Sequence, residues 1–186
     1  MKKLIGFDID GVLADFVHPF GKLAEEMFGI RARSAGAQQQ WRFNSLTDEQ
    51  ERELWDRIDG DPLGLFWENL PLLVTPGELA DMDALRSEGY MFIFVTSRHS
   101  KAKYATERWL GDRGFVGGLH MMKHKAPYLA ELENLRAFID DSPAHLNAMH
   151  ETGVNAYARD WPYNREIAGT VPRVGSVGEY LYQVAG

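Results

Sequence analysis

Two aspartates near the amino terminus, Asp8 and Asp10, have the residue type and spacing that metal or phosphate chemistry needs. They directly follow the short apolar run 4–7 and precede Gly11, a residue type that relaxes the backbone where a strand turns. In open α/β sheets, ligands bind just beyond the carboxyl ends of the strands. A calcium loop does not fit, because its later ligand positions and its glutamate are missing. The pair therefore predicts a divalent cation at a strand end.

Two later apolar runs also end in polar residues. One ends in Thr96, Ser97 and Arg98, and another in Asp140 and Asp141. A parallel sheet brings such strand ends to the same edge, so we expect all these side chains to meet Asp8 there. Structural roles remain open beside the chemical ones, because hydroxyls at a strand-to-helix junction cap helices and one aspartate of the later pair suits a cap as well.

A lysine lies between the second and third of these polar groups, either Lys123 or Lys125. We favour Lys125 because it stands just before a predicted helix. Carboxylates, hydroxyls and a lysine together suit phosphoryl transfer, which needs charge neutralisation, a nucleophile and a proton donor. Magnesium prefers oxygen ligands, and a carboxylate can itself attack a phosphoryl group. The combination predicts a magnesium-dependent site at which a phosphoryl group is transferred.

The elements that must position these residues follow an α/β pattern. Periodicity predicts a strand over 4–7 and a helix over 16–28, and a capping box of Thr47 and Gln50 predicts the next helix. Residues 29–40 resemble a loop, with a helix over 35–40 as the alternative. From Val74 onward, helices and strands alternate as in parallel βαβ units. The predicted segments there are helix 75–89, strand 90–95, helix 101–110 ended by Gly111, strand 119–122, helix 126–135, strand 138–139, a helix from Pro143, a last core strand 154–157 and helix 178–184.

The motifs FDIDGVLADF, FVTSR, a lysine before a helix and FIDDSP resemble, in this order, those of the haloacid dehalogenase-like (HAD) phosphohydrolases. DGVLADF and the insertion after it resemble the 5′(3′)-deoxyribonucleotidases, which hydrolyse nucleoside monophosphates. The resemblance implies an α/β fold, with a Rossmann-like three-layer parallel core over 1–15 and 74–186. It also implies a small, mainly helical cap over 16–73.

The resemblance also implies roles for individual residues. Asp8 is expected to be the nucleophile and a ligand of Mg²⁺, and Asp10 the acid/base, which also offers the metal its backbone carbonyl. The remaining expected contacts are Thr96 or Ser97 and Lys125 to the phosphoryl group, with Lys123 as the substitute, and Asp140 and Asp141 to the metal. We leave open which of the last two binds the metal directly.

Arg98 is a departure from the nucleotidase pattern, which usually has a proline after its Thr-Ser pair. An extra cation there has two interpretations. Either it binds a phosphate or a second anionic group of the substrate, or it pairs with a nearby acid.

The insertion 16–73 is rich in aromatic residues, which either stack on a nucleobase or form the core of the cap itself. We take Trp41, Phe43, Phe66 and Trp67 as candidates for the substrate pocket, because they lie in less regular segments than Trp55. His120 and His124 straddle an expected strand and loop, so they do not indicate a metal site.

Composition narrows the partners. The 186 residues carry a formal charge of −7 and no cysteine, which argues against broad nucleic-acid binding and against disulfides, and fits a cytoplasmic protein. No apolar stretch predicts a signal peptide or a membrane span. The expected substrate is a small phosphate ester, and the chain is compatible with a homodimer. The alternatives are a phosphatase for another small ester or a polynucleotide 3′-phosphate, and a domain that binds a phosphorylated ligand without catalysis.

Overall fold

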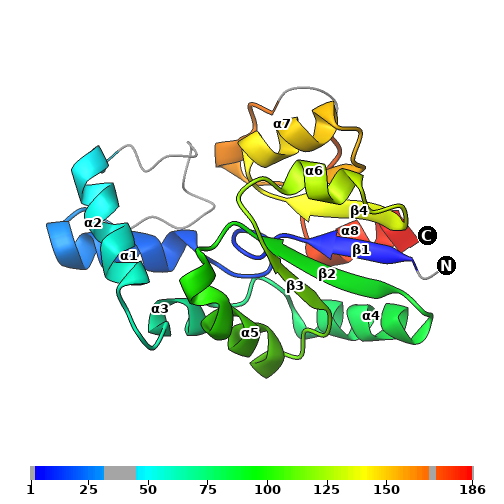
Figure 1. Cartoon of the computed structure of the whole chain (residues 1–186), viewed down its shortest axis with the longest axis horizontal. Helices are drawn as coiled ribbons and strands as arrows, with labels where there is room; N and C mark the ends of the chain where they lie inside the picture. Colours follow the sequence, from blue (N-terminus) through cyan, green and yellow to red (C-terminus); the bar gives the residue numbers. More distant parts are fainter. Residues whose placement is uncertain (1–2, 32–44, 168–170, 186) are drawn as a thin grey trace.

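The central element is a parallel sheet with the strand order β3-β2-β1-β4-β5-β6 (Figure 1). The computed structural model describes residues 3–31, 45–167 and 171–185. Its strands are β1 (Leu4–Phe7), β2 (Met91–Thr96), β3 (Gly118–Met121), β4 (Leu135–Asp140), β5 (Ala156–Arg159) and β6 (Arg173–Val174). The direction in which strands are added reverses at β1 and β4, and open α/β sheets bind ligands at this kind of point.

Helices cover both faces of the sheet, which gives the three layers expected from the sequence. The helices are α1 (Val17–Phe28), α2 (Asp48–Asp59), α3 (Leu65–Glu68), α4 (Pro76–Ser87), α5 (Lys103–Asp112), α6 (Lys125–Ala130), α7 (Pro143–Glu151) and α8 (Val177–Ala185). The core on one face includes side chains of α4, α5 and α8, and the core on the other includes those of α6 and α7. All four residues of β1 are buried, so the strand that leads to Asp8 is fixed from both sides.

The helices α1, α2 and α3 occupy the insertion between β1 and α4, and α1 and α2 lie beyond the sheet in Figure 1. The two segments that lead into and out of this insertion run side by side, since Leu73 N donates to Leu13 O and Asp15 N to Pro71 O, both at 2.8 Å. The capping box of Thr47 and Gln50 is present at the start of α2. The division into a cap over 16–73 and a core over 1–15 and 74–186 stays a prediction.

Several predicted boundaries were wrong. Gly111 lies inside α5, because a helix tolerates glycine and the left-handed turn comes only at Gly114. The helix predicted over 126–135 ends at Ala130, and Leu135 already begins β4. The strand predicted over 154–157 is not the last, because the two-residue β6 pairs with β5. The alternative helix over 35–40 lies outside the described residues. Among the described residues, no helix is both long and apolar enough to cross a membrane.

Candidate active site

Asp8 and Asp140 meet because β1 and β4 are neighbours in register. Phe7 pairs with Ile139, and Asp8 N donates to Ile139 O at 2.8 Å. Lys125 reaches both carboxylates from the start of α6, with its Nζ 2.7 Å from Asp8 Oδ1 and 2.8 Å from Asp140 Oδ2. Only 1% of the Lys125 side chain is exposed. Of the two candidate lysines, Lys125 therefore contacts Asp8 and Asp140, whereas Lys123 is an exposed residue of the pocket wall.

Asp141 lies on the other side of the acidic group, facing the loop after β1. Its Oδ2 accepts a hydrogen bond from Tyr163 Oη at 2.6 Å. Gly11 has φ +78°, and a Cβ at that position would collide with the Asp141 carboxylate. Glycine at this turn is therefore needed both for its backbone conformation and for its lack of a side chain.

The hydrogen bonds divide the carboxylate oxygens into occupied and available ones. Asp8 Oδ1 also accepts from Ile9 N at 2.7 Å, and Asp140 Oδ1 accepts from Ser142 N at 2.8 Å. Both oxygens of Asp140 are therefore engaged, since Lys125 takes the other. Asp8 Oδ2 and Asp141 Oδ1 have no hydrogen-bond or ion-pair partner among the described residues, and both aspartates line the pocket. Asp140 is better placed to hold Lys125, and Asp141 to bind a ligand.

The pKa values of these residues reflect an excess of negative charge at a buried site. Burial raises the pKa of Asp8 from 3.8 to about 7, although Lys125 opposes the shift. Burial, Asp8 and Asp140 together hold the pKa of Asp141 well above its usual value. Burial also acts against ionised Asp140, but Lys125 and His145 together outweigh it and lower the pKa of Asp140 to about 2. Burial alone would lower the pKa of Lys125, yet Asp140 and Asp8 raise it above its usual value.

This donor set fits a divalent cation such as Mg²⁺. Asp8, Asp140 and Asp141 each offer an oxygen within 4.8 Å of the others, and carboxylate oxygens are the ligands that Mg²⁺ prefers. Three carboxylates face the single ammonium group of Lys125, so a divalent cation would balance the charge. The carboxylate of Asp10 is not part of this group.

The raised pKa of Asp8 predicts how the stability of the metal-free protein depends on pH. Between about pH 4 and 7, the unfolded chain has lost a proton that the folded state still holds, so the free energy of unfolding falls as pH rises. Thermal unfolding in a chelator should therefore give a lower Tm at about pH 8 than at about pH 5. Added Mg²⁺ should raise the Tm more at the higher pH, where the carboxylates are ionised. A Tm in chelator that rises between these two pH values would contradict the excess of negative charge in this acidic group.

The hydroxyls after β2 have different surroundings. Thr96 is buried, and its Oγ1 accepts a hydrogen bond from Arg98 N at 3.2 Å, so it stabilises the turn. Ser97 is exposed, and its Oγ shares a hydrogen bond with His145 Nε2 at 3.4 Å. His145 on α7 also places Nδ1 3.3 Å from Asp140 Oδ2. Both hydroxyl residues line the pocket, and Ser97, whose Oγ also donates a hydrogen bond to Met122 O at 3.4 Å, is the exposed one of the two.

Arg98 pairs with Asp10. Its Nε donates to Asp10 Oδ2 at 2.9 Å and its Nη2 to Asp10 Oδ1 at 2.7 Å. Of the two interpretations of Arg98, the pairing with a nearby acid is the one that this geometry contains. The guanidinium, predicted among the phosphate contacts on sequence grounds, is bound by both oxygens of Asp10.

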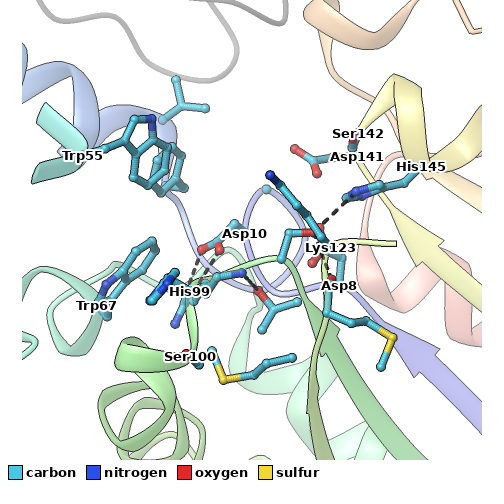
Figure 2. Close-up of a pocket in the computed structure, with 18 of the residues that line it drawn as sticks. Asp8, Asp10, Trp55, Trp67, His99, Ser100, Lys123, Asp141, Ser142 and His145 are labelled. Atoms are coloured by element: carbon cyan, nitrogen blue, oxygen red, sulfur yellow. Dashed lines mark hydrogen bonds and ion pairs between the residues drawn. The ribbon is translucent and has the colours of Figure 1, made fainter. Parts of the chain in front are cut away.

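A cavity of about 760 Å³ joins these groups to an aromatic wall. Its polar end is lined by Asp8, Ser97, Lys123, Asp141, Ser142 and His145, and its aromatic end by Phe16, Trp55, Asp59 and Trp67. Figure 2 shows Trp55 and Trp67 on the side of the pocket opposite Asp141, Ser142 and His145. The rings of Phe16, Trp55 and Trp67 contact one another, with centroids 5.7 Å apart for Phe16 and Trp55, 6.0 Å for Phe16 and Trp67, and 6.4 Å for the two tryptophans.

Only part of this wall was predicted. Trp67 lines the pocket, whereas Phe66 packs edge-on against Trp67 and is not among the lining residues. Trp41 and Phe43 lie outside the described residues. Trp55, which was not among the predicted pocket residues, does line the pocket, because Leu54 and Ile58 form the buried stripe of α2. The neighbouring face of α2 carries Trp55 and Asp59, whose spacing of four residues was the available signal.

Comparisons with known proteins agree with this architecture. No protein-family model matches the chain. A Bacillus cereus protein provisionally named a nucleotidase is 24% identical over 182 residues, which cover 92% of either chain. A predicted phosphoglycolate phosphatase from Haemophilus somnus aligns with a TM-score of 0.59 at 20% identity, over 98% of this chain and 97% of that one.

A third similar protein is the L-2-haloacid dehalogenase of Xanthobacter autotrophicus, solved with chloropropionic acid covalently bound. It aligns with a TM-score of 0.63 at 13% identity, over 100% of this chain and 99% of that one. The chain thus has the α/β fold of the HAD-like hydrolases, as the resemblance of its motifs implied.

Proposed function

We propose that this protein is a magnesium-dependent phosphomonoesterase that hydrolyses nucleoside monophosphates through a phosphoryl group on Asp8. One observation carries the proposal. Asp8 lies in the pocket with one carboxylate oxygen held by Lys125 and Ile9 N, while the other has no such partner in the described part of the chain. A carboxylate fixed at one oxygen beside a buried cation is a suitable nucleophile for a phosphoryl group.

The reaction has two steps, both of which use the chain's own residues. Asp8 Oδ2 attacks phosphorus, and the bond from phosphorus to the nucleoside oxygen breaks, so that its electron pair goes to the leaving oxygen. Asp10 gives that oxygen a proton. Asp10 then removes a proton from water as the water attacks phosphorus, and the bond from phosphorus to Asp8 breaks. Inorganic phosphate leaves, and both carboxyl groups return to their starting states.

The surrounding residues hold the phosphoryl group and a cation. Asp8 and Asp141 would bind Mg²⁺ directly, and Asp140 would position Lys125. The resemblance adds the backbone carbonyl of Asp10, which stays a prediction. The cation, when bound, supplies positive charge opposite the phosphoryl oxygens. Ser97 would donate a hydrogen bond to the same oxygens.

The aromatic end of the pocket supports a nucleoside as the leaving group. Stacked Phe16, Trp55 and Trp67 offer flat apolar surface that suits a nucleobase. The cavity volume is also in the range of small-molecule sites. The name of the Bacillus cereus relative favours the same substrate class. The phosphoglycolate phosphatase among the similar structures makes another small phosphate ester the principal competing substrate.

A substrate panel tests the proposal. Release of phosphate would be measured from nucleoside 5′- and 3′-monophosphates, ribose 5-phosphate, phosphoglycolate and a 3′-phosphorylated oligonucleotide, each with Mg²⁺ and with a chelator. We expect hydrolysis only with the cation, and a higher kcat/KM for nucleotides than for ribose 5-phosphate, which has no base to stack. Equal values for these two would refute the role of the aromatic wall. Nucleotide binding without turnover at any metal concentration would indicate a non-catalytic domain.

A further inference from the structure

We propose that Arg98 is the positioning residue of Asp10, holding the carboxylate in the orientation in which it exchanges a proton with the leaving oxygen and with water. The inference rests on the proposed function, in which Asp10 is the acid/base. Asp10 follows β1 and Arg98 follows β2, so two adjacent strands bring them together across 88 positions of sequence.

The contact between the two side chains is bidentate. Nε and Nη2 of Arg98 donate to different oxygens of Asp10, at 2.9 and 2.7 Å. Two parallel hydrogen bonds fix the plane and direction of a carboxylate, which a single charge does not. The Asp10 side chain is 24% exposed and lines the pocket, so its remaining lone pairs are accessible to substrate and water.

Arg98 is itself held rigidly. Its Nη1 donates to Thr106 Oγ1 at 3.0 Å, and that hydroxyl gives its own proton to Ala102 O, which leaves it as an acceptor for Arg98. The guanidinium also lies over the ring of Trp67, 4.6 Å from the centroid. Only 1% of the Arg98 side chain is exposed. The support thus comes from α5 and from the pocket wall of α3.

This arrangement determines what Arg98 does and what it does not do. Its charge is paired with Asp10, so it is not available for a second anionic group of the substrate. Without the two hydrogen bonds from Arg98, the Asp10 carboxylate is free to rotate in the pocket. A misplacement of about 1 Å in a reacting group lowers a rate by about 10²-fold. The loss should fall on proton transfer, not on substrate binding.

Leaving-group dependence separates proton transfer from other effects. The value of kcat/KM reports steps through departure of the alcohol, which for a nucleoside needs a proton from Asp10. The p-nitrophenolate ion leaves without one. We expect Arg98→Met to lower kcat/KM for a nucleoside monophosphate by about 10²-fold, and for p-nitrophenyl phosphate by less than about 5-fold. Arg98→Lys keeps the positive charge but cannot make the two parallel hydrogen bonds, so it should behave like Arg98→Met.

The control is Arg86→Met, which removes an exposed arginine of α4 that pairs only with Asp83 among the described residues. It should leave both substrates unaffected. Equal losses for the two substrates in both Arg98 variants would show that Arg98 only maintains the pocket, and unchanged rates would also overturn the inference. If Arg98→Met does not fold, the same comparison in Arg98→Lys decides. A wild-type protein that hydrolyses neither substrate would instead refute the proposed function on which the inference rests.

Discussion

We expect Asp8→Asn to lower the rate of phosphate release from the best substrate by at least about 10⁴-fold, as the loss of a nucleophile does elsewhere. The amide has nearly the same shape as the carboxylate but is a very poor nucleophile. It also weakens the acidic group that would bind Mg²⁺. Initial rates with saturating substrate and Mg²⁺ measure the effect.

The same variant separates chemistry from folding. Because burial disfavours the ionised Asp8 carboxylate, a neutral amide should leave the metal-free protein at least as stable at neutral pH. Asp81→Asn on the exposed side of α4 is a matched control and should keep full activity. Full activity in Asp8→Asn would end the proposed role of Asp8. Lost activity with a collapsed Tm would attribute the loss to folding.

Lys125→Met should have the largest effect on stability. It removes the ammonium group that lies between Asp8 and Asp140, and thereby leaves the acidic group without its cation. Breaking a buried ion pair on one side typically costs about 3–5 kcal/mol of the free energy of unfolding. For a chain of this length, the Tm in chelator should fall by about 10 °C.

The matched control is Lys123→Met, because that lysine is exposed and has no such ion pair among the described residues. Its Tm should remain near that of the wild-type protein, since exposed substitutions change stability by about 0.5 kcal/mol or less. Mg²⁺ should recover part of the stability of Lys125→Met by supplying positive charge beside the carboxylates. Equal unfolding curves for Lys125→Met and the wild-type protein in chelator would refute the proposed balance of charge.

The framework of the site could be predicted because it depends on local pattern. A buried apolar run followed by polar residues marked the ends of β1, β2 and β4, and a parallel sheet necessarily brings those ends to one edge. The position of Lys125 just before a predicted helix favoured it over Lys123, and Lys125 is the lysine that contacts Asp8 and Asp140. These inferences need only the period of a strand and the direction of a sheet.

The rest depends on contacts that no local pattern specifies. The Asp10–Arg98 pair spans 88 positions, and the hydrogen bond from Tyr163 to Asp141 comes from a 3₁₀ turn over Pro162–Asn164 that has no pattern of its own. The less regular sequence around Phe66 favoured it over Trp55 as a pocket residue. The buried stripe of α2, however, orients this helix so that Trp55 lines the pocket. Short segments such as β6 are similarly determined by tertiary pairing.

The most direct test of the account is to look for the phosphoryl group on Asp8. The protein would be mixed with its best substrate and Mg²⁺, quenched in acid during turnover, digested and analysed by mass spectrometry. We predict that the peptide containing Asp8 gains the mass of one phosphoryl group, and that Asp8→Asn shows no such gain. Continued turnover with that peptide unmodified, or with a phosphoryl group on another residue, would contradict the account.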